Sequence, residues 1–154
     1  QNIGVSRTQA KQLIDEYFQE FPKVKEYMDF SIEKARENEF VETILGRRRY
    51  LKDINSRNRM LRAMAERNAI NAPIQGSAAD IIKKAMIDIQ REMEKIQMKS
   101  KMLLQVHDEL VFDMHKTEEE VLKKLVKKKM EHAVELNVPL ITQLGIGNNW
   151  LEAH

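Results

Sequence analysis

The chain has 154 residues, of which 42% are hydrophobic and 32% charged, and its formal net charge is +2. A chain of this length buries about 70% of the surface that it exposes when unfolded, and its composition excludes a disordered protein and a membrane-spanning one, which needs an apolar run of about 18 residues. Because there is no cysteine, a disulfide scaffold, a thiolate nucleophile and a cysteine-based zinc site are also excluded.

The first 39 residues are predicted to be helical. Ser6 and Gln9 have the spacing of a capping box, which marks the start of a helix. Apolar residues then recur at intervals of three and four and predict one buried stripe: Leu13, Ile14, Tyr17, Phe18 and Phe21. Pro22 ends or restarts this helix, and a second amphipathic helix follows it.

An arginine-rich hairpin is predicted over residues 40–52, because two short strand-like runs flank Gly46. Residues 56–97 are again predicted to be helical. Within them, the sequence Asn71-Ala72-Pro73 predicts that one helix stops and another begins, since proline is tolerated in the first turn of a helix and disfavoured in its interior.

The last third of the chain is predicted to hold a second hairpin, a helix and a strand. Two apolar runs around a polar triplet predict the hairpin over 102–114, an amphipathic pattern predicts a helix over 117–136, and 139–147 has the composition of a final strand. With no repeat and no linker, residues 1–154 are predicted to form a single α+β unit, mostly helical, with a small antiparallel sheet.

The polar triplet His107-Asp108-Glu109 is the most informative candidate for chemistry. Adjacent carboxylates at a rigid hairpin tip suit hard divalent cations, which prefer oxygen ligands and assist phosphoryl transfer. One such pair is half of a two-metal site, so a carboxylate from elsewhere has to complete it. Taken alone, the composition favours a simpler interpretation, because aspartate is a common turn residue and a hairpin tip is normally polar.

A second group consists of Arg67, Asn71 and Gln75. The first two are four residues apart and share a helix face, and Gln75 follows Pro73. A guanidinium and two amides can hydrogen-bond to phosphates or to the acceptors of a minor groove. The alternative is a solvated helix face with a capping asparagine.

A third group is the run Arg47, Arg48 and Arg49. Lysine dominates the rest of the chain, whereas this stretch and the helix after it carry arginine. Arginine is the better bidentate ligand for phosphate, so the run indicates contact with a nucleic-acid backbone, with an ordinary cationic surface as the alternative.

Four segments resemble family A DNA polymerases, the bacterial DNA polymerase I type, and occur in the family's order. The segment Leu104–Phe112 (LQVHDELVF) resembles motif C, and Ala65–Asp80 (AERNAINAPIQGSAAD) resembles the segment that follows the fingers. Thr43–Tyr50 (TILGRRRY) and Gly145–Trp150 (GIGNNW) are similar to the family as well. The resemblance covers almost the whole chain, and four segments in order are far more specific than any one of them.

The resemblance implies a fold and a set of roles. The fold would be the C-terminal part of a right-hand polymerase domain, the palm plus part of the fingers. Asp108 would be the metal-binding and catalytic aspartate of motif C, Glu109 its neighbouring metal-binding carboxylate, and His107 would lie near the primer terminus. The remaining candidates would bind primer–template DNA: Arg67, Asn71, Gln75, Arg47, Arg48 and Arg49.

The resemblance also implies that this chain is incomplete. The family's other metal-binding aspartate, in motif A, and the helix that grips the incoming nucleotide precede anything present here, and thumb and exonuclease segments are missing. Gln1 in place of methionine agrees with an excised piece. We therefore expect a fragment that ends near the natural C-terminus and cannot polymerise alone.

The function expected of the parent is DNA-directed DNA polymerisation. The primer 3′-hydroxyl would attack a deoxynucleoside triphosphate with the help of two Mg²⁺ ions, which the fragment alone would bind weakly or not at all. Primer–template DNA and deoxynucleoside triphosphates are the expected partners, with no membrane, and the expected location is the bacterial cytoplasm, associated with the nucleoid.

Two alternatives remain open. One is a non-catalytic nucleic-acid-binding module that uses only the arginine-rich segments, whose binding would be indifferent to Asp108 and to divalent metal. The other is a helical interaction domain whose basic residues only keep it soluble. Paired carboxylates beside phosphate-seeking arginines argue against both, because without a cation between them they would repel DNA.

Overall fold

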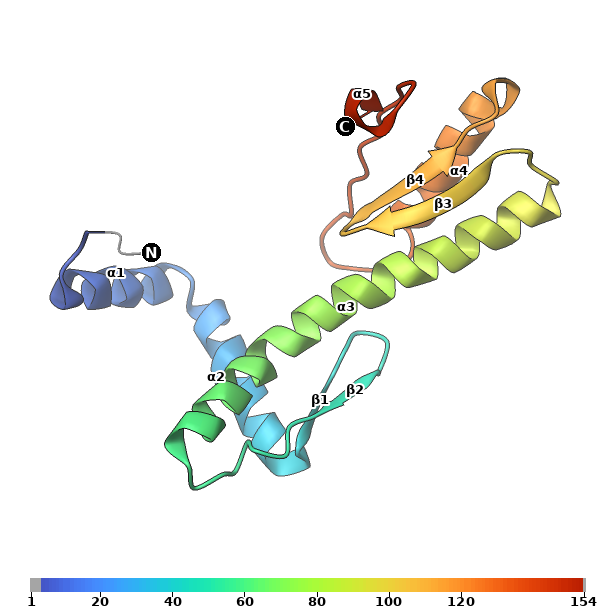
Figure 1. Cartoon of the computed structure of the whole chain (residues 1–154). Helices are drawn as coiled ribbons and strands as arrows, with labels where there is room; N and C mark the ends of the chain where they lie inside the picture. Colours follow the sequence, from blue (N-terminus) through green and yellow to red (C-terminus); the bar gives the residue numbers. More distant parts are fainter. Residues whose placement is uncertain (1–3, 154) are drawn as a thin grey trace. The chain divides into compact units, whose positions relative to one another are not determined.

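The computed structural model describes residues 4–153 (Figure 1). The chain divides into two compact units, Gln1–Ser77 and Ala78–His154, where the sequence predicts a single one. The division follows from the burial of apolar residues, which form two separate clusters, one in each unit. The elements are helices and two two-stranded antiparallel sheets, so the predicted α+β class is confirmed.

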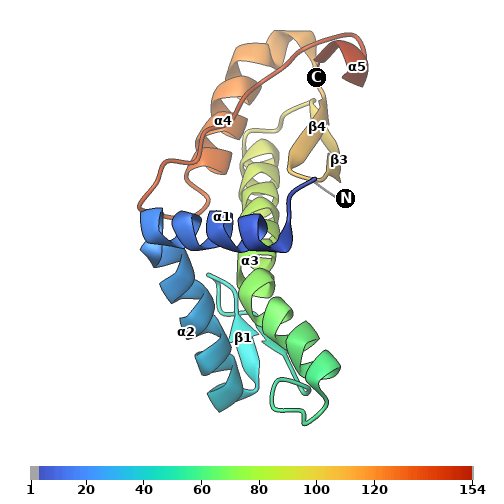
Figure 2. The ribbon, with the colours of Figure 1, turned by 90° about the vertical axis from the view of Figure 1, so that its left-hand side faces the viewer.

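The first unit contains two helices, a short hairpin and the start of a long helix. These are α1 (Arg7–Glu20), α2 (Pro22–Asn38), β1 (Phe40–Glu42), β2 (Arg48–Tyr50) and the N-terminal part of α3 (Arg59–Lys95). Figure 2 shows β1 between α2 and α3. The core between α2, the hairpin with the loop after it and α3 contains no residue of α1, and its alanines let helix and strand approach closely: Ala35, Val41, Leu51, Ile54, Ala65, Ala69 and Ala72.

The apolar stripe of α1 is exposed, so its predicted burial is wrong. The capping box of Ser6 and Gln9 is present as predicted. Leu13 and Ile14 are each 54% exposed, however, and no residue of the helix is buried. The periodicity correctly marks an amphipathic helix, but no other part of the described chain buries its apolar face.

The long helix α3 runs without interruption through Pro73, which corrects the predicted stop and restart. An interior proline removes one helical hydrogen bond and costs about 3 kcal/mol. Burial outweighs this cost, because Ala65 and Ala69 before the proline and Ile82, Ala85 and Ile89 after it are all buried. The helix is therefore set by tertiary packing rather than by the local signal.

The second unit is built around the second hairpin. It contains the C-terminal part of α3, β3 (Lys101–Val106), β4 (Glu109–Asp113), the 3₁₀ turn η1 (Lys116–Glu118), α4 (Glu119–Glu131) and α5 (Trp150–Ala153). The hairpin lies against α4 (Figure 1). Its core consists of Ala85, Ile89, Met93, Leu122, Val126 and Ala133, with Leu110 and Phe112 of β4 packed against it.

The end of the chain departs from the prediction in two places. The predicted helix over 117–136 ends at Glu131, and the segment 139–147, predicted as a strand, contains none. A strand needs a neighbour whose backbone groups pair with it, and the hairpin here pairs only within itself. In the absence of such a neighbour, the N–H of Thr142 donates to a carboxylate oxygen of Glu131 at 3.0 Å. No helix among residues 4–153 is long and apolar enough to span a membrane.

A carboxylate fixes the base of the second hairpin. Glu118 accepts hydrogen bonds from the N–H groups of Lys99 and Ser100 at 2.8 and 2.9 Å and from the Ser100 hydroxyl at 2.7 Å. The buried Ser100 oxygen in turn accepts the N–H of His115 at 2.9 Å. The strands are thereby joined at the end opposite the tip, which makes the hairpin a rigid support for the tip residues.

This arrangement predicts a loss of stability in acid. The backbone hydrogen bond from Lys99, followed by those from Ser100, lowers the pKa of Glu118 to about 2. A lowered pKa means that the stabilisation is complete above the ordinary value of 4.5 and is lost as the pH falls towards 2. We expect the melting temperature of the wild type to be higher than that of Glu118→Gln at pH 7. The difference between the two melting temperatures should shrink as the pH falls from 4.5 to 2. A difference that is constant with pH would contradict this account.

Candidate functional site

The polar tip of the second hairpin is a tight two-residue turn. Val106 pairs with Glu109, so His107 and Asp108 alone connect the strands. His107 has a φ of 53°, a conformation that side chains other than glycine adopt infrequently. The side-chain amide of Gln105 donates to the His107 carbonyl at 2.7 Å and fixes the turn. Glu39 and Gln97 also have a positive φ, and histidine is one of the residues that adopt this conformation more often than most.

The two carboxylates at the tip have different surroundings. Asp108 is exposed and makes no hydrogen bond or ion pair with the rest of residues 4–153. Glu109 is half-buried, and its Oε2 accepts the indole N–H of Trp150 at 3.3 Å. The two residues supply the hard oxygen donors that Mg²⁺ prefers. Within the described residues they are not joined by a third acidic, histidine or cysteine ligand, so the donor set fits the metal but is incomplete.

The second predicted group lies along one face of α3. Arg67, Asn71 and Gln75 are each four residues apart and all are exposed. Because α3 continues through Pro73, Gln75 shares a face with the other two, which the predicted helix break would not have ensured. None of the three side chains bonds to another residue in the described part of the chain. The helix therefore presents a stripe of polar groups that is available to a ligand.

The three arginines of the first hairpin have three different environments. Arg47 donates to the Gly76 carbonyl of α3 at 3.2 Å. Arg48 forms an ion pair with Glu42 at 2.9 Å and lies over the ring of Phe40, 4.4 Å from its centre. The hydrogen bond to Glu42 raises the pKa of Arg48. Only the side chain of Arg49 has no hydrogen bond or ion pair within residues 4–153, although its backbone pairs with Val41, and its guanidinium is therefore available to a phosphate.

A shallow cavity of ≈ 70 Å³ brings two of the predicted groups together. Arg47 and Arg49 of the hairpin and Gln75 of α3 all line it. Ser77 supports this contact, because its Oγ accepts the N–H of Ile44 at 2.8 Å and donates to the Pro73 carbonyl at 2.5 Å. The first unit thus places two arginines and an amide from separate segments around one hollow.

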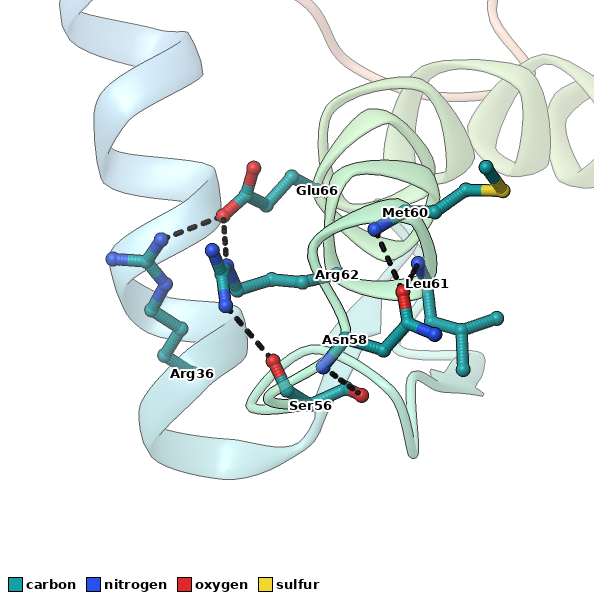
Figure 3. A network of polar contacts seen from close by, with 7 residues as sticks. All are labelled: Arg36, Ser56, Asn58, Met60, Leu61, Arg62 and Glu66. Atoms are coloured by element: carbon teal, nitrogen blue, oxygen red, sulfur yellow. Dashed lines mark hydrogen bonds and ion pairs between the residues drawn. The ribbon is translucent and has the colours of Figure 1, made fainter.

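The arginines at the start of α3 are in part structural. Arg62 donates to the Ser56 carbonyl at 2.9 Å, and Glu66 joins it to Arg36 of α2, whose Nη2 lies 2.6 Å from the carboxylate (Figure 3). Asn58 caps the helix by accepting the N–H of Met60 at 2.9 Å (Figure 3). Arginine content alone therefore overstates the surface that is available to nucleic acid.

Gly76 and Trp150 contribute to the site without having been selected as site residues. A Cβ added to Gly76 would lie 2.5 Å from Cγ2 of Thr43, so glycine allows the first hairpin to pack on α3. An isolated glycine inside a helical pattern is a signal for such close packing. Trp150 ends a segment that is similar to the family, but the sequence did not predict its contact with Glu109, which joins residues 41 positions apart.

The family model of DNA polymerase family A matches residues 1–152, and the chain belongs to this family. The chain is 49% identical to a DNA polymerase I of Bacillus subtilis and 53% identical to one of Streptococcus pneumoniae, in both cases over 99% of its own length. It spans only 17% of the length of either relative.

A solved structure supports the fold. The chain resembles the POL domain of Pol1 from M. smegmatis, solved in complex with DNA primer-template and dNTP, with a TM-score of 0.96 and 43% identity. The match covers 99% of this chain and 27% of the solved one. The fold of a family A polymerase segment is thereby confirmed.

Proposed function

We propose that the chain is part of a DNA-directed DNA polymerase and supplies the motif C end of its catalytic site. The observation that carries the proposal is the rigid tip of the second hairpin, which presents Asp108 and Glu109 side by side in a chain of family A. Deoxynucleoside triphosphates and primer–template DNA are the proposed substrates, because the solved relative from M. smegmatis is a complex with both. The bacterial cytoplasm remains the predicted location.

Asp108 and Glu109 would hold Mg²⁺ at this tip. When bound, a pair of such ions stabilises the charge that develops on the attacking and leaving oxygens of phosphoryl transfer. The contribution of the chain itself is positional: paired strands and the hydrogen bonds of Glu118 and Gln105 hold the two carboxylates before any ligand arrives. His107, between these carboxylates and β3, is proposed to lie near the primer terminus.

The DNA would lie against the polar stripe of α3 and the first hairpin. Arg67, Asn71 and Gln75 carry hydrogen-bond donors that are not used within the described chain, and Arg49 adds a free guanidinium beside Gln75. Amides and guanidinium groups that contact sugar, phosphate and minor-groove atoms hold a duplex without reading its sequence. Such contacts suit an enzyme that copies any template. Arg47 and Arg48 remain proposed DNA ligands with a weaker case, because both have partners inside the chain.

The proposal is tested by transplanting this chain into a complete relative. In a chimera, the matching 17% of the Bacillus subtilis DNA polymerase I is replaced by these residues. We expect the chimera to extend a primer in the presence of Mg²⁺ and all four deoxynucleoside triphosphates, whereas the 154-residue chain alone, with a single acidic pair at its tip, extends none. Gel analysis of primer length measures both.

A folded chimera that binds primer–template DNA but does not extend it would overturn the proposal. In that case the non-catalytic nucleic-acid-binding module takes its place. Far-ultraviolet circular dichroism and a cooperative thermal transition establish that the chimera is folded. Extension by the isolated chain would refute the proposed inactivity of the fragment and leave the proposed chemistry intact.

The different environments of Arg48 and Arg49 predict unequal effects on DNA binding. In the chimera, Arg49→Ala removes a guanidinium that has no partner in the described chain, and we expect several-fold weaker duplex binding and a salt slope smaller by about 1. Arg48→Ala is the matched comparison, and we expect a smaller loss of binding, because that guanidinium is already engaged by Glu42 and Phe40. Fluorescence anisotropy of labelled duplex at several salt concentrations measures both. A wild-type slope for Arg49→Ala would show that Arg49 does not contact phosphate.

A further inference from the structure

The indole of Trp150, near the C-terminal end of the chain, contacts the carboxylate of Glu109 at the tip of the second hairpin. Its Nε1–H donates to Oε2 of Glu109 at 3.3 Å, across 41 residues of sequence. An indole has a single hydrogen to donate and no acceptor. This hydrogen is directed at one of the two carboxylates proposed to hold metal.

Packing alone does not account for the position of Trp150. The residue is 49% exposed, and its neighbour Leu151 is 88% exposed, so α5 is not part of the core. A tryptophan placed for burial would contribute most of its large apolar area to an interior. Here about half of that area remains in solvent, and the hydrogen bond to Glu109 is the specific contact.

The segment that carries Trp150 is fixed before any ligand binds. The Glu152 carboxylate accepts the N–H of Asn148 at 2.9 Å and the side-chain amides of Asn148 and Asn149 at 3.0 and 2.8 Å. Oδ1 of Asn149 accepts the N–H of Glu152 at 3.1 Å, which closes the reciprocal pattern. These hydrogen bonds lower the pKa of Glu152, and the backbone N–H of Asn148 makes the largest contribution. The indole is therefore held by an ordered turn.

Two glycines make this fold-back possible. A Cβ on Gly145 would lie 1.7 Å from the Ala153 carbonyl oxygen, and one on Gly147 would lie 2.5 Å from Cβ of Glu152. The chain before the turn thus runs against α5 at a distance that only glycine permits. Gly145, Gly147 and the Asn148–Glu152 turn together form what we call the C-terminal clasp.

We propose that Trp150 is a positioning residue for Glu109, held in place by the C-terminal clasp. The indole N–H restrains one carboxylate oxygen of Glu109, which fixes the rotation of the carboxylate and the direction of its second oxygen. Asp108, by contrast, has no such restraint within residues 4–153. The proposal rests on the proposed polymerase function, because only there does the orientation of Glu109 affect a rate. Groups that orient metal ligands typically change metal affinity or activity by 10–100-fold.

The test is a double-mutant cycle in the chimera with Trp150→Phe, Glu109→Gln and the double variant. Phenylalanine keeps one aromatic ring and removes the N–H donor together with the five-membered ring that carries it. We expect Trp150→Phe to raise the Mg²⁺ concentration for half-maximal extension about tenfold and to lower kcat without changing KM for the nucleotide. In the Glu109→Gln background the same substitution should have little further effect, because the group through which it acts has been changed.

A second readout does not depend on activity. Trp150 is the single tryptophan of the chain, so intrinsic fluorescence of the 154 residues reports its surroundings alone. We expect Glu109→Gln to change the emission intensity or wavelength, because a carboxylate in contact with the indole is replaced by an amide. Glu135→Gln, an exposed carboxylate of the same unit, is the matched control and should leave the emission unchanged.

Three outcomes would overturn the proposal: equal losses from Trp150→Phe in both backgrounds, no change in Mg²⁺ dependence, or identical emission from the Glu109→Gln and Glu135→Gln chains. Failure of the proposed function is seen separately, as a chimera in which Asp108→Asn extends primers as well as the wild type. In that case the fluorescence arm still reports whether the contact between Trp150 and Glu109 forms.

Discussion

Replacing Asp108 with asparagine in the chimera is expected to reduce primer extension by on the order of a thousandfold, the upper end of what the loss of one electrostatic group costs a preorganised site. Asparagine has almost the same shape and leaves the turn of the hairpin intact, but it carries no charge with which to bind a divalent cation. Because the Asp108 side chain is exposed and makes no hydrogen bond or ion pair within residues 4–153, stability should not change. A rate measured at saturating nucleotide, together with a thermal melt, separates the two effects.

The matched control for this prediction is Asp113→Asn. Asp113 lies at the opposite end of the same hairpin, in β4 across from Lys101, and is also exposed. Its substitution removes the same charge from the same hairpin without touching the tip, and we expect wild-type extension. If Asp108→Asn retains wild-type extension, the motif C assignment fails. Equal losses in both variants would mean that net charge, rather than the tip carboxylate, governs the rate.

Gly145→Ala is expected to open the C-terminal clasp. The added methyl group would lie 1.7 Å from the carbonyl oxygen and 2.8 Å from the carbonyl carbon of Ala153, and these are backbone atoms that cannot rotate away. Such overpacking typically costs about 1–3 kcal/mol, and the short α5 has no buried residue that would offset this cost. We therefore expect Trp150 to move into solvent, with red-shifted emission, and extension by the chimera to fall at least as far as in Trp150→Phe.

Ile146→Ala is the control for the clasp. It changes the residue next to Gly145, removes volume instead of adding it, and affects a side chain that is already 47% exposed. Its emission spectrum and unfolding midpoint should remain close to those of the wild type. Wild-type emission from Gly145→Ala would show that the glycine does not approach Ala153 in solution, and the ordered clasp would have to be abandoned.

Local sequence signals predicted some features of this chain correctly and others wrongly. Ser6 and Gln9 form the predicted capping box because a cap depends only on residues three positions apart. Pro73 has an equally clear local signal, yet α3 passes through it, because buried alanines and isoleucines on both sides stabilise one continuous helix. The stripe of α1 shows the reverse case, in which an apolar pattern is present and nothing in the described chain buries it.

In the candidate site, too, some features were predicted from local sequence and others depend on tertiary contacts. The two apolar runs around His107-Asp108-Glu109 were enough to predict a hairpin with the polar triplet at its tip, and the structure contains this hairpin. Proximity in sequence did not distinguish Arg47, Arg48 and Arg49. Their surroundings separate them, because Arg47 bonds to α3, Arg48 bonds to the facing strand, and Arg49 is left at the shallow cavity.

By itself, the sequence determined the class of fold, the two hairpins, the family resemblance and the position of the paired carboxylates. Each of these depends on periodicity, turn chemistry or short motifs, which act over a few residues. Only the tertiary structure decided that α3 is continuous, that residues 139–147 form no strand, and that Trp150 contacts Glu109. These features depend on contacts between residues far apart in the chain, whose free energy appears only once burial and hydrogen bonding have brought the segments together.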